Sequence, residues 1–199
     1  VFQSGLTMPD RDYYLKPDEA SARARVEFEA YVQKLLALAG DRDAASGAKR
    51  IAALESRIAN HHWSRVENRD PVKTYNRVDL PGAARLTPGF DWDAVLEGAG
   101  LAGRVTALDI NQPTYVRELA RLIRMMPVSD WRLYFKFRLL DAYAPYLAAD
   151  FERAHFEFHE RSLTGVEQPK PRWQRAVQSM NGSVGELIGK LYVEATFPP

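Results

Sequence analysis

The chain has 199 residues, of which 46% are hydrophobic and 27% are charged, a composition typical of one globular domain with a sizeable core. Its 27 basic and 26 acidic residues are spread along the whole sequence, which argues against nucleic-acid binding because that requires a concentrated basic face. No apolar run approaches the roughly 18 residues that a membrane-spanning helix needs. Cysteine is absent, so neither disulfides nor thiolate metal sites can form.

Neither end of the sequence resembles a natural terminus. It begins at Val1 without a secretory leader and stops at Pro198 and Pro199. We therefore expect a fragment of a longer protein, whose leader or anchor this sequence does not reveal.

Helical signals dominate the first third of the chain. Pro17 ends an irregular opening segment, and Asp18 and Glu19 supply acidic side chains that favour a helix start. Apolar spacing predicts a helix over 18–39, ended by Gly40, and a second helix over 43–62. From 63 to 103 prolines and glycines break the pattern, so only 91–97 is predicted as a helix, and 104–110 is predicted as a single strand without a partner.

The second half of the chain is also predicted to be helical. We expect a helix over 113–126, a long run over 129–165 that Pro145 kinks or splits, and a last helix that continues through Asn181 and Gly182. The aromatic residues predicted to form core within the long run are Trp131, Tyr134, Phe135 and Phe158. The fold class is therefore predicted to be all-α, an irregular multi-helix bundle with long ordered loops.

The sequence HFEFH at 155–159 places His155 and His159 four residues apart, on one face of a helix. Zinc peptidases use this spacing with a Glu directly after the first His as general base. Here that position is Phe156, and Glu157 is expected on the far side of the helix. Glu152 shares the face of both histidines and is the candidate third ligand of a small metal site. The single Glu-x-x-His copy and the missing base favour a surface or packing role.

Other polar clusters are predicted to be structural. His61 and His62 are adjacent and point about 100° apart on a helix, so they cannot face one metal ion. Two acidic pairs are assigned to loop or cap positions, where carboxylates accept backbone N–H groups: Asp10 with Asp12, and Asp91 with Asp93. Asn181 to Ser183 forms a glycosylation sequon within a predicted helix. No complete catalytic constellation is present.

Two polar-aromatic loops are more specific. GLTMPDRDYY (5–14) and RDPVKTYN (69–76) each contain an Arg-Asp pair that can fix loop backbone. With further segments in the same order, they resemble the neprilysin and endothelin-converting-enzyme family of zinc endopeptidases. The further segments are Asp91-Trp92, Pro113 with Tyr115, Trp131 with Tyr134, Phe156-x-Phe158, Leu163-x-Gly165, Pro171-Arg172-Trp173, and Gly189-x-Leu191-Tyr192-Val193 with Phe197.

The resemblance covers nearly the whole chain. It implies that 1–199 is a single helical domain, a fragment of the N-terminal lobe of a two-lobed metallopeptidase. In this family the zinc motifs, His-Glu-x-x-His and a downstream Glu-x-x-x-Asp, lie in the C-terminal lobe. No catalytic residue and no metal ligand can therefore be carried over to this sequence, and the substrate-binding residues stay unassigned. Ala176 stands where many relatives have a cysteine, so packing alone must replace the disulfides of the animal enzymes.

The leading hypothesis is that the chain forms the lid and wall of the substrate cavity of a bacterial zinc metalloendopeptidase and is inactive alone. Zinc is expected in the parent enzyme, bound by the absent lobe, and none in this fragment. The expected partners are that catalytic lobe and small peptide substrates, with no nucleic acid and no membrane span. The resemblance implies an extracytoplasmic location, whether periplasmic, secreted or membrane-anchored.

Two alternatives belong to other classes of protein. The first is a stand-alone helical module that binds a protein or peptide partner without catalysis. The second is a small metalloprotein that uses Glu152, His155 and His159.

Overall fold

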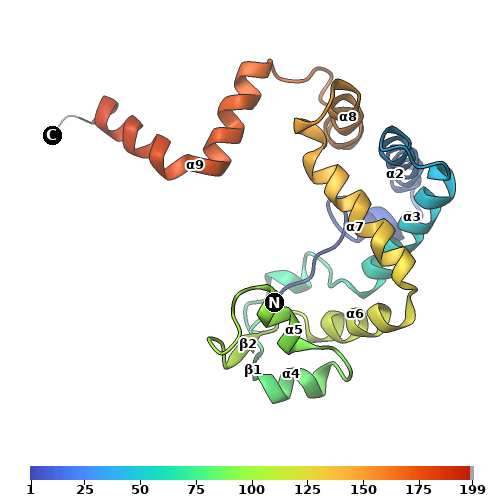
Figure 1. Ribbon diagram of the computed structural model, residues 1–199, viewed down its shortest axis with the longest axis vertical. Coiled ribbons are helices and arrows are strands. Elements are labelled where there is room, and N and C mark those ends of the chain that lie inside the picture. Colours follow the sequence, from blue (N-terminus) through green and yellow to red (C-terminus); the bar gives the residue numbers. More distant parts are fainter. Residues whose placement is uncertain (198–199) are drawn as a thin grey trace.

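The computed structural model describes residues 1–197, and Pro198 and Pro199 lie outside the described part. Within this part the chain forms nine α-helices, short 3₁₀ and π-helical segments and two three-residue strands, so the all-α prediction is confirmed (Figure 1). None of these helices is both long and apolar enough to cross a membrane. The helices are α1 (Asp12–Leu15), α2 (Glu19–Leu38), α3 (Ala44–His61), α4 (Leu80–Leu86), α5 (Trp92–Gly98), α6 (Pro113–Met125), α7 (Val128–Tyr143), α8 (Ala149–His155) and α9 (Arg172–Thr196).

Helices α2 and α3 form where their signals predict, and the structure shows that they pack against each other as a hairpin. Asp18 caps α2 by accepting a hydrogen bond from the Ser21 amide. Gly40, at φ +83°, ends α2 in the left-handed conformation that glycine adopts without a steric cost. The hairpin presents the apolar sides of both helices to α7 and α8.

Four aromatic side chains form the centre of the larger core. Phe28 and Tyr31 lie on α2, Phe137 on α7, and Phe158 on the π-helical segment Phe156–Ser162 that follows α8. The Tyr31 ring stacks on Phe158 at 4.7 Å, and Phe28 meets Phe137 edge-on at 6.1 Å. Burial of each such ring contributes about 1.5–3 kcal/mol. These contacts fix α2, α7 and the π-helical segment relative to one another.

The loop at 5–11 is fastened to α3 by a buried carboxylate. Glu55 is fully buried and accepts hydrogen bonds from the Thr7 amide at 2.8 Å, the Thr7 hydroxyl at 2.7 Å and the Tyr14 hydroxyl at 2.5 Å. Arg138 on α7 donates to the Thr7 hydroxyl and lies 3.9 Å from the carboxylate. The loop is therefore fixed by a residue of α3 as well as by its own Arg11, which donates to the His62 carbonyl.

A small antiparallel sheet corrects the prediction for the middle of the chain. Strand β2 (Ala107–Asp109) lies within the predicted strand, but it has a partner, β1 (Arg77–Asp79), with Val78 opposite Leu108. The prediction of only one helix over 63–103 is also wrong. Helix α4 forms there because Asp79 caps its first turn and Pro81 fits that turn.

The long run over 129–165 is split at Pro145, as predicted. Helix α7 ends at Tyr143, a 3₁₀ turn covers Ala144–Tyr146, and α8 follows and packs on α2. Phe158 and Tyr134 are buried as predicted, whereas Phe135 is 62% exposed, so its assignment to the core is wrong. Phe135 follows the helical spacing of the core residues but points to a side of α7 that no described element covers.

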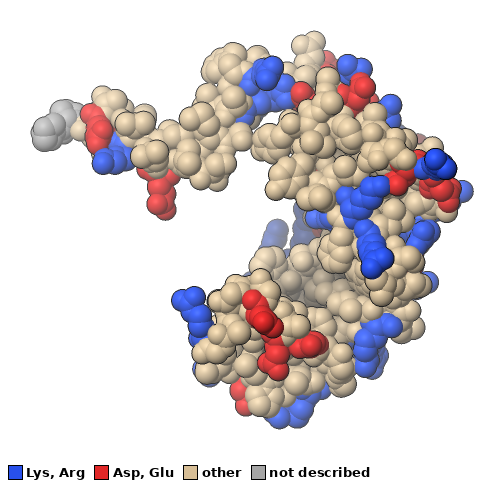
Figure 2. All heavy atoms as spheres, in the orientation of Figure 1, with Lys and Arg blue, Asp and Glu red and all other residues tan. Residues whose placement is uncertain are grey.

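Helix α9 extends as an arm away from the other helices (Figure 1). It continues through Asn181 and Gly182, as predicted, and bends at Val184, whose φ/ψ of −134°/32° is not helical. None of its residues is buried. The arm, α7 and the α4–α6 region enclose a hollow, and the surface of α7 and α9 toward it is mostly uncharged (Figure 2).

Candidate functional site

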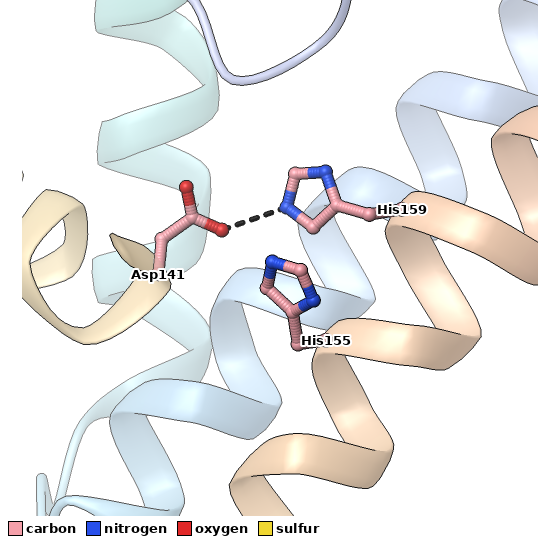
Figure 3. A group of neighbouring side chains, drawn as sticks. All are labelled: Asp141, His155 and His159. Carbon is pink, nitrogen blue, oxygen red and sulfur yellow. Dashed lines mark hydrogen bonds and ion pairs between the residues drawn. The ribbon is translucent and has the colours of Figure 1, made fainter. Parts of the chain in front are cut away.

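Three potential metal ligands from three helical elements meet at one point of the fold (Figure 3). Asp141 lies near the end of α7, His155 ends α8, and His159 lies in the π-helical segment. One ligand atom from each lies within 4.8 Å of the others. Asp141 Oδ1 is 2.8 Å from His159 Nε2, and the two imidazole rings are 4.3 Å apart between centroids.

The helical geometry explains why both histidines face Asp141. In an α-helix, residues four apart are rotated by only about 40°, so the two side chains project from the same face of the helix. Phe158 is buried against Tyr31, and the Tyr31 ring also meets the His159 ring edge-on at 5.4 Å. The pair is therefore positioned by the aromatic core.

The carboxylate is the best fixed of the three groups. Asp141 Oδ1 also accepts a hydrogen bond from the Tyr31 hydroxyl at 2.7 Å. Burial alone would raise the pKa of Asp141, but the hydrogen bonds from His159 and Tyr31 hold it below its ordinary value. Burial, reinforced by the neighbouring His159, lowers the pKa of His155 to about 4. At neutral pH the site thus holds a carboxylate beside an uncharged His155.

The site remains accessible from solvent. The side chains of His159 and Asp141 are 23% and 13% exposed, and His155 is half-buried. Among the described residues, no hydrogen bond is found for either ring nitrogen of His155. An incoming ligand would therefore meet a free ring nitrogen as well as the paired Asp141 and His159.

The structure changes the predicted third member of this group. Glu152 shares the helix face with the histidines, but its carboxylate lies 2.5 Å from Arg175 of α9. Asp141 takes its place, a residue that the sequence analysis did not consider. Glu157 is exposed and outside the group, as predicted. Asp141 meets the histidines because α7 and α8 both pack on α2, and no periodicity in the sequence signals this packing.

The remaining candidates occupy structural positions. His62 is buried with Nε2 3.1 Å from the Ser4 carbonyl oxygen, and burial lowers its pKa. Asp10 accepts from the Asp12 amide, and Asp91 caps α5 by accepting from the Ala94 amide. These contacts confirm the assignments of Asp10 and Asp91 to loop and cap roles.

Apolar side chains on α7 and α9 form a second feature, which we call the apolar face. It consists of Phe135, Leu139 and Tyr143 on α7, and Trp173, Val177, Met180, Val184, Leu187 and Leu191 on α9, all of them exposed. A cavity of about 460 Å³ with almost entirely apolar walls lies beside Phe135 and is bounded by Tyr115, Trp131 and Tyr134. Exposed apolar surface of this extent is typical of an interface.

The fold resembles that of solved zinc metalloproteases. The chain is similar to zinc metalloprotease Zmp1 of Mycobacterium tuberculosis in its open state, with 35% identity and a TM-score of 0.93 over the whole chain and 31% of that protein. For the inhibitor complex of Zmp1 the identity is also 35% and the TM-score 0.93, over 98% of this chain and 30% of the other. The relatives also include endothelin-converting enzyme-like 1 of Rattus norvegicus, 27% identical over 99% of this chain and 26% of that protein.

The model of Peptidase family M13 matches residues 1–199. The chain therefore belongs to peptidase family M13, and the predicted relationship to the neprilysin and endothelin-converting-enzyme family is confirmed. It spans about a quarter of the length of the curated relatives and about three tenths of the solved ones.

Proposed function

We propose that this chain forms the wall and lid of a substrate cavity in a zinc endopeptidase and limits its substrates to small peptides. The observation that carries the proposal is the match of the whole chain to one end of much longer zinc peptidases, together with an apolar face that no described element covers. The chain itself supplies no catalytic group.

The catalytic zinc does not fit the residues of this chain. The family motif needs Glu directly after the first histidine, and this position holds Phe156. Glu157 is exposed and points away from the two imidazoles. The zinc that activates water for peptide hydrolysis is therefore assigned to a catalytic lobe of the same polypeptide.

The apolar face is the surface that we assign to that lobe. On α9 its residues recur every three to four positions, which places them on one side of each half of the helix, before and after the bend at Val184. The solved relatives include open, partly open and inhibitor-bound states of Zmp1. A lid that moves relative to the catalytic lobe would explain how peptides enter a closed cavity. By analogy with the family we place the enzyme outside the cytoplasm.

The first test concerns the chain by itself. The 199-residue chain, supplied with zinc, is expected to show no turnover of short peptides, and turnover that a chelator abolishes would refute the proposal. The coding sequence beyond residue 199 is expected to encode His-Glu-x-x-His. A stop codon soon after Pro199 would instead favour the helical interaction module.

A second test concerns the apolar face. In the longest polypeptide that carries this chain, Leu187→Asp is expected to lower peptidase activity at least tenfold, because it places a charge on the proposed contact. Lys190→Asp is the matched control, since Lys190 lies on the same helix, is exposed and pairs with Glu194 at 3.9 Å. Equal activity of the two variants would exclude α9 as a contact with the catalytic lobe.

A further inference from the structure

We propose that Asp141, His155 and His159 form a zinc-binding site that joins α7 to α8 and the π-helical segment. The proposal concerns the wall itself and does not depend on the cavity function. Two imidazoles and one carboxylate are a ligand set that Zn²⁺ prefers, with water in the fourth position.

The distances suit this ion. Zinc bonds of about 2.0–2.1 Å place two ligand atoms of a tetrahedral site roughly 3.3 Å apart. The separation between Asp141 Oδ1 and His159 Nε2 is 2.8 Å, and all three ligand atoms lie within 4.8 Å. Figure 3 shows a nitrogen of each ring on the side toward Asp141. Small side-chain rotations would therefore bring the three atoms to zinc-binding distance.

The residues around the three ligands hold them as the surroundings of protein metal sites commonly do. Ligating carboxylates in proteins are commonly oriented by an additional hydrogen bond, and the Tyr31 hydroxyl supplies one to Asp141 at 2.7 Å. Tyr31 is itself held by its stacking on Phe158. The cation of Arg138, one turn before Asp141, is directed instead to Thr7 and Glu55. Zinc would replace the hydrogen bond between Asp141 and His159 and engage the unpaired His155.

An ion bound at this site would connect residues on both sides of the break between α7 and α8. Asp141 precedes the break at Pro145, and both histidines follow it. Bound zinc would close the loop between them and fix the angle between α7 and α8. Because Glu152 of α8 pairs with Arg175 of α9, the same ion would restrain the base of the arm.

The test is a zinc titration of the full 199-residue chain, followed by competition with a chromophoric chelator. We expect one zinc ion per chain, a rise in melting temperature with zinc, and affinity reduced at least tenfold by His155→Ala, His159→Gln or Asp141→Asn. Glu152→Gln and His61→Ala are the matched controls and should bind like the wild type. Site variants that bind zinc as tightly as the wild type and the two controls would show unspecific binding and would refute the site.

Two further measurements separate loss of the ligands from loss of the fold and test the coordination of the ion. Circular dichroism of each variant without metal should match that of the wild type, which excludes loss of fold as the cause of weaker binding. Co²⁺ in place of zinc should give the visible spectrum of a four-coordinate nitrogen and oxygen site, and His155→Ala should abolish it. A wild-type spectrum identical to that of aqueous Co²⁺ would refute the proposal and leave the cavity function unaffected.

Discussion

The buried Glu55 carboxylate gives the sharpest prediction for stability. It is fully buried on α3, and burial raises its pKa to about 7, against the opposing effect of the hydrogen bonds from Tyr14 and Thr7. The ordinary value is 4.5. Between these two pH values the folded chain keeps a proton on Glu55 that the unfolded chain has lost.

The sign of the pH dependence follows from this difference. Since the native state binds more protons between about pH 4.5 and 7, raising the pH through this range favours unfolding. A difference of about 2.5 pKa units at 1.36 kcal/mol each corresponds to a loss of about 3 kcal/mol, complete above pH 7. Below pH 4.5 Glu55 is protonated in both states and contributes no pH dependence.

The perturbation is Glu55→Gln, which has nearly the same shape and does not titrate. Its carbonyl oxygen can still accept from the Thr7 amide and the Tyr14 hydroxyl, but its NH₂ group cannot accept from the Thr7 hydroxyl. We therefore expect a constant loss of about 1–3 kcal/mol relative to the protonated acid. The assay is urea denaturation of both proteins from pH 5 to 8, followed by far-UV circular dichroism. The wild-type advantage over the variant should shrink by up to about 3 kcal/mol across this range.

Subtracting the two curves removes the contributions of all other titrating groups. The exposed Glu157→Gln provides a control for the substitution itself and should parallel the wild type at every pH. A difference between wild type and Glu55→Gln that does not change with pH would refute the raised pKa. A difference that grows with pH would show that the ionised carboxylate stabilises the fold.

Three further substitutions test the packing and the helix ends, each by thermal or urea denaturation. Phe137→Ala should cost about 3–5 kcal/mol because its ring is fully buried, whereas Phe135→Ala, on the exposed side of α7, should cost under about 1 kcal/mol. Asp18→Ala should cost about 1 kcal/mol by removing the cap of α2. Gly5→Ala should cost at least about 1 kcal/mol, since φ is +96° and the new Cβ would lie 3.1 Å from the Tyr134 hydroxyl.

Local features of the fold could be predicted wherever one residue dictates the backbone. Pro145 removes a helical hydrogen bond and splits the long run, and Asp18 caps α2, so both boundaries were correct. The short strand β1 could not be predicted, because three residues carry too little periodicity. Its pairing with β2 joins segments thirty residues apart.

In the candidate site, too, the sequence predicts the local geometry but not the residues that tertiary packing adds. The i, i+4 spacing places His155 and His159 on one face, and the structure confirms that part. The same rule selects Glu152, which the fold instead turns to Arg175. Asp141 joins the histidines only because Tyr31 and Phe158 pack α7 and the π-helical segment onto α2, and such tertiary contacts have no periodic signal.

The apolar face bears on which function is correct. Helical spacing alone predicted Phe135 as core, and the error has a physical cause, because an amphipathic pattern records that a side is apolar but not what covers it. Burying six apolar side chains of α9 would contribute on the order of 10 kcal/mol. An arm that projects from its own domain cannot gain this energy within the described fold. Either proposed partner, a catalytic lobe or a separate protein, would supply it, and the match of the whole chain to much longer peptidases favours the lobe.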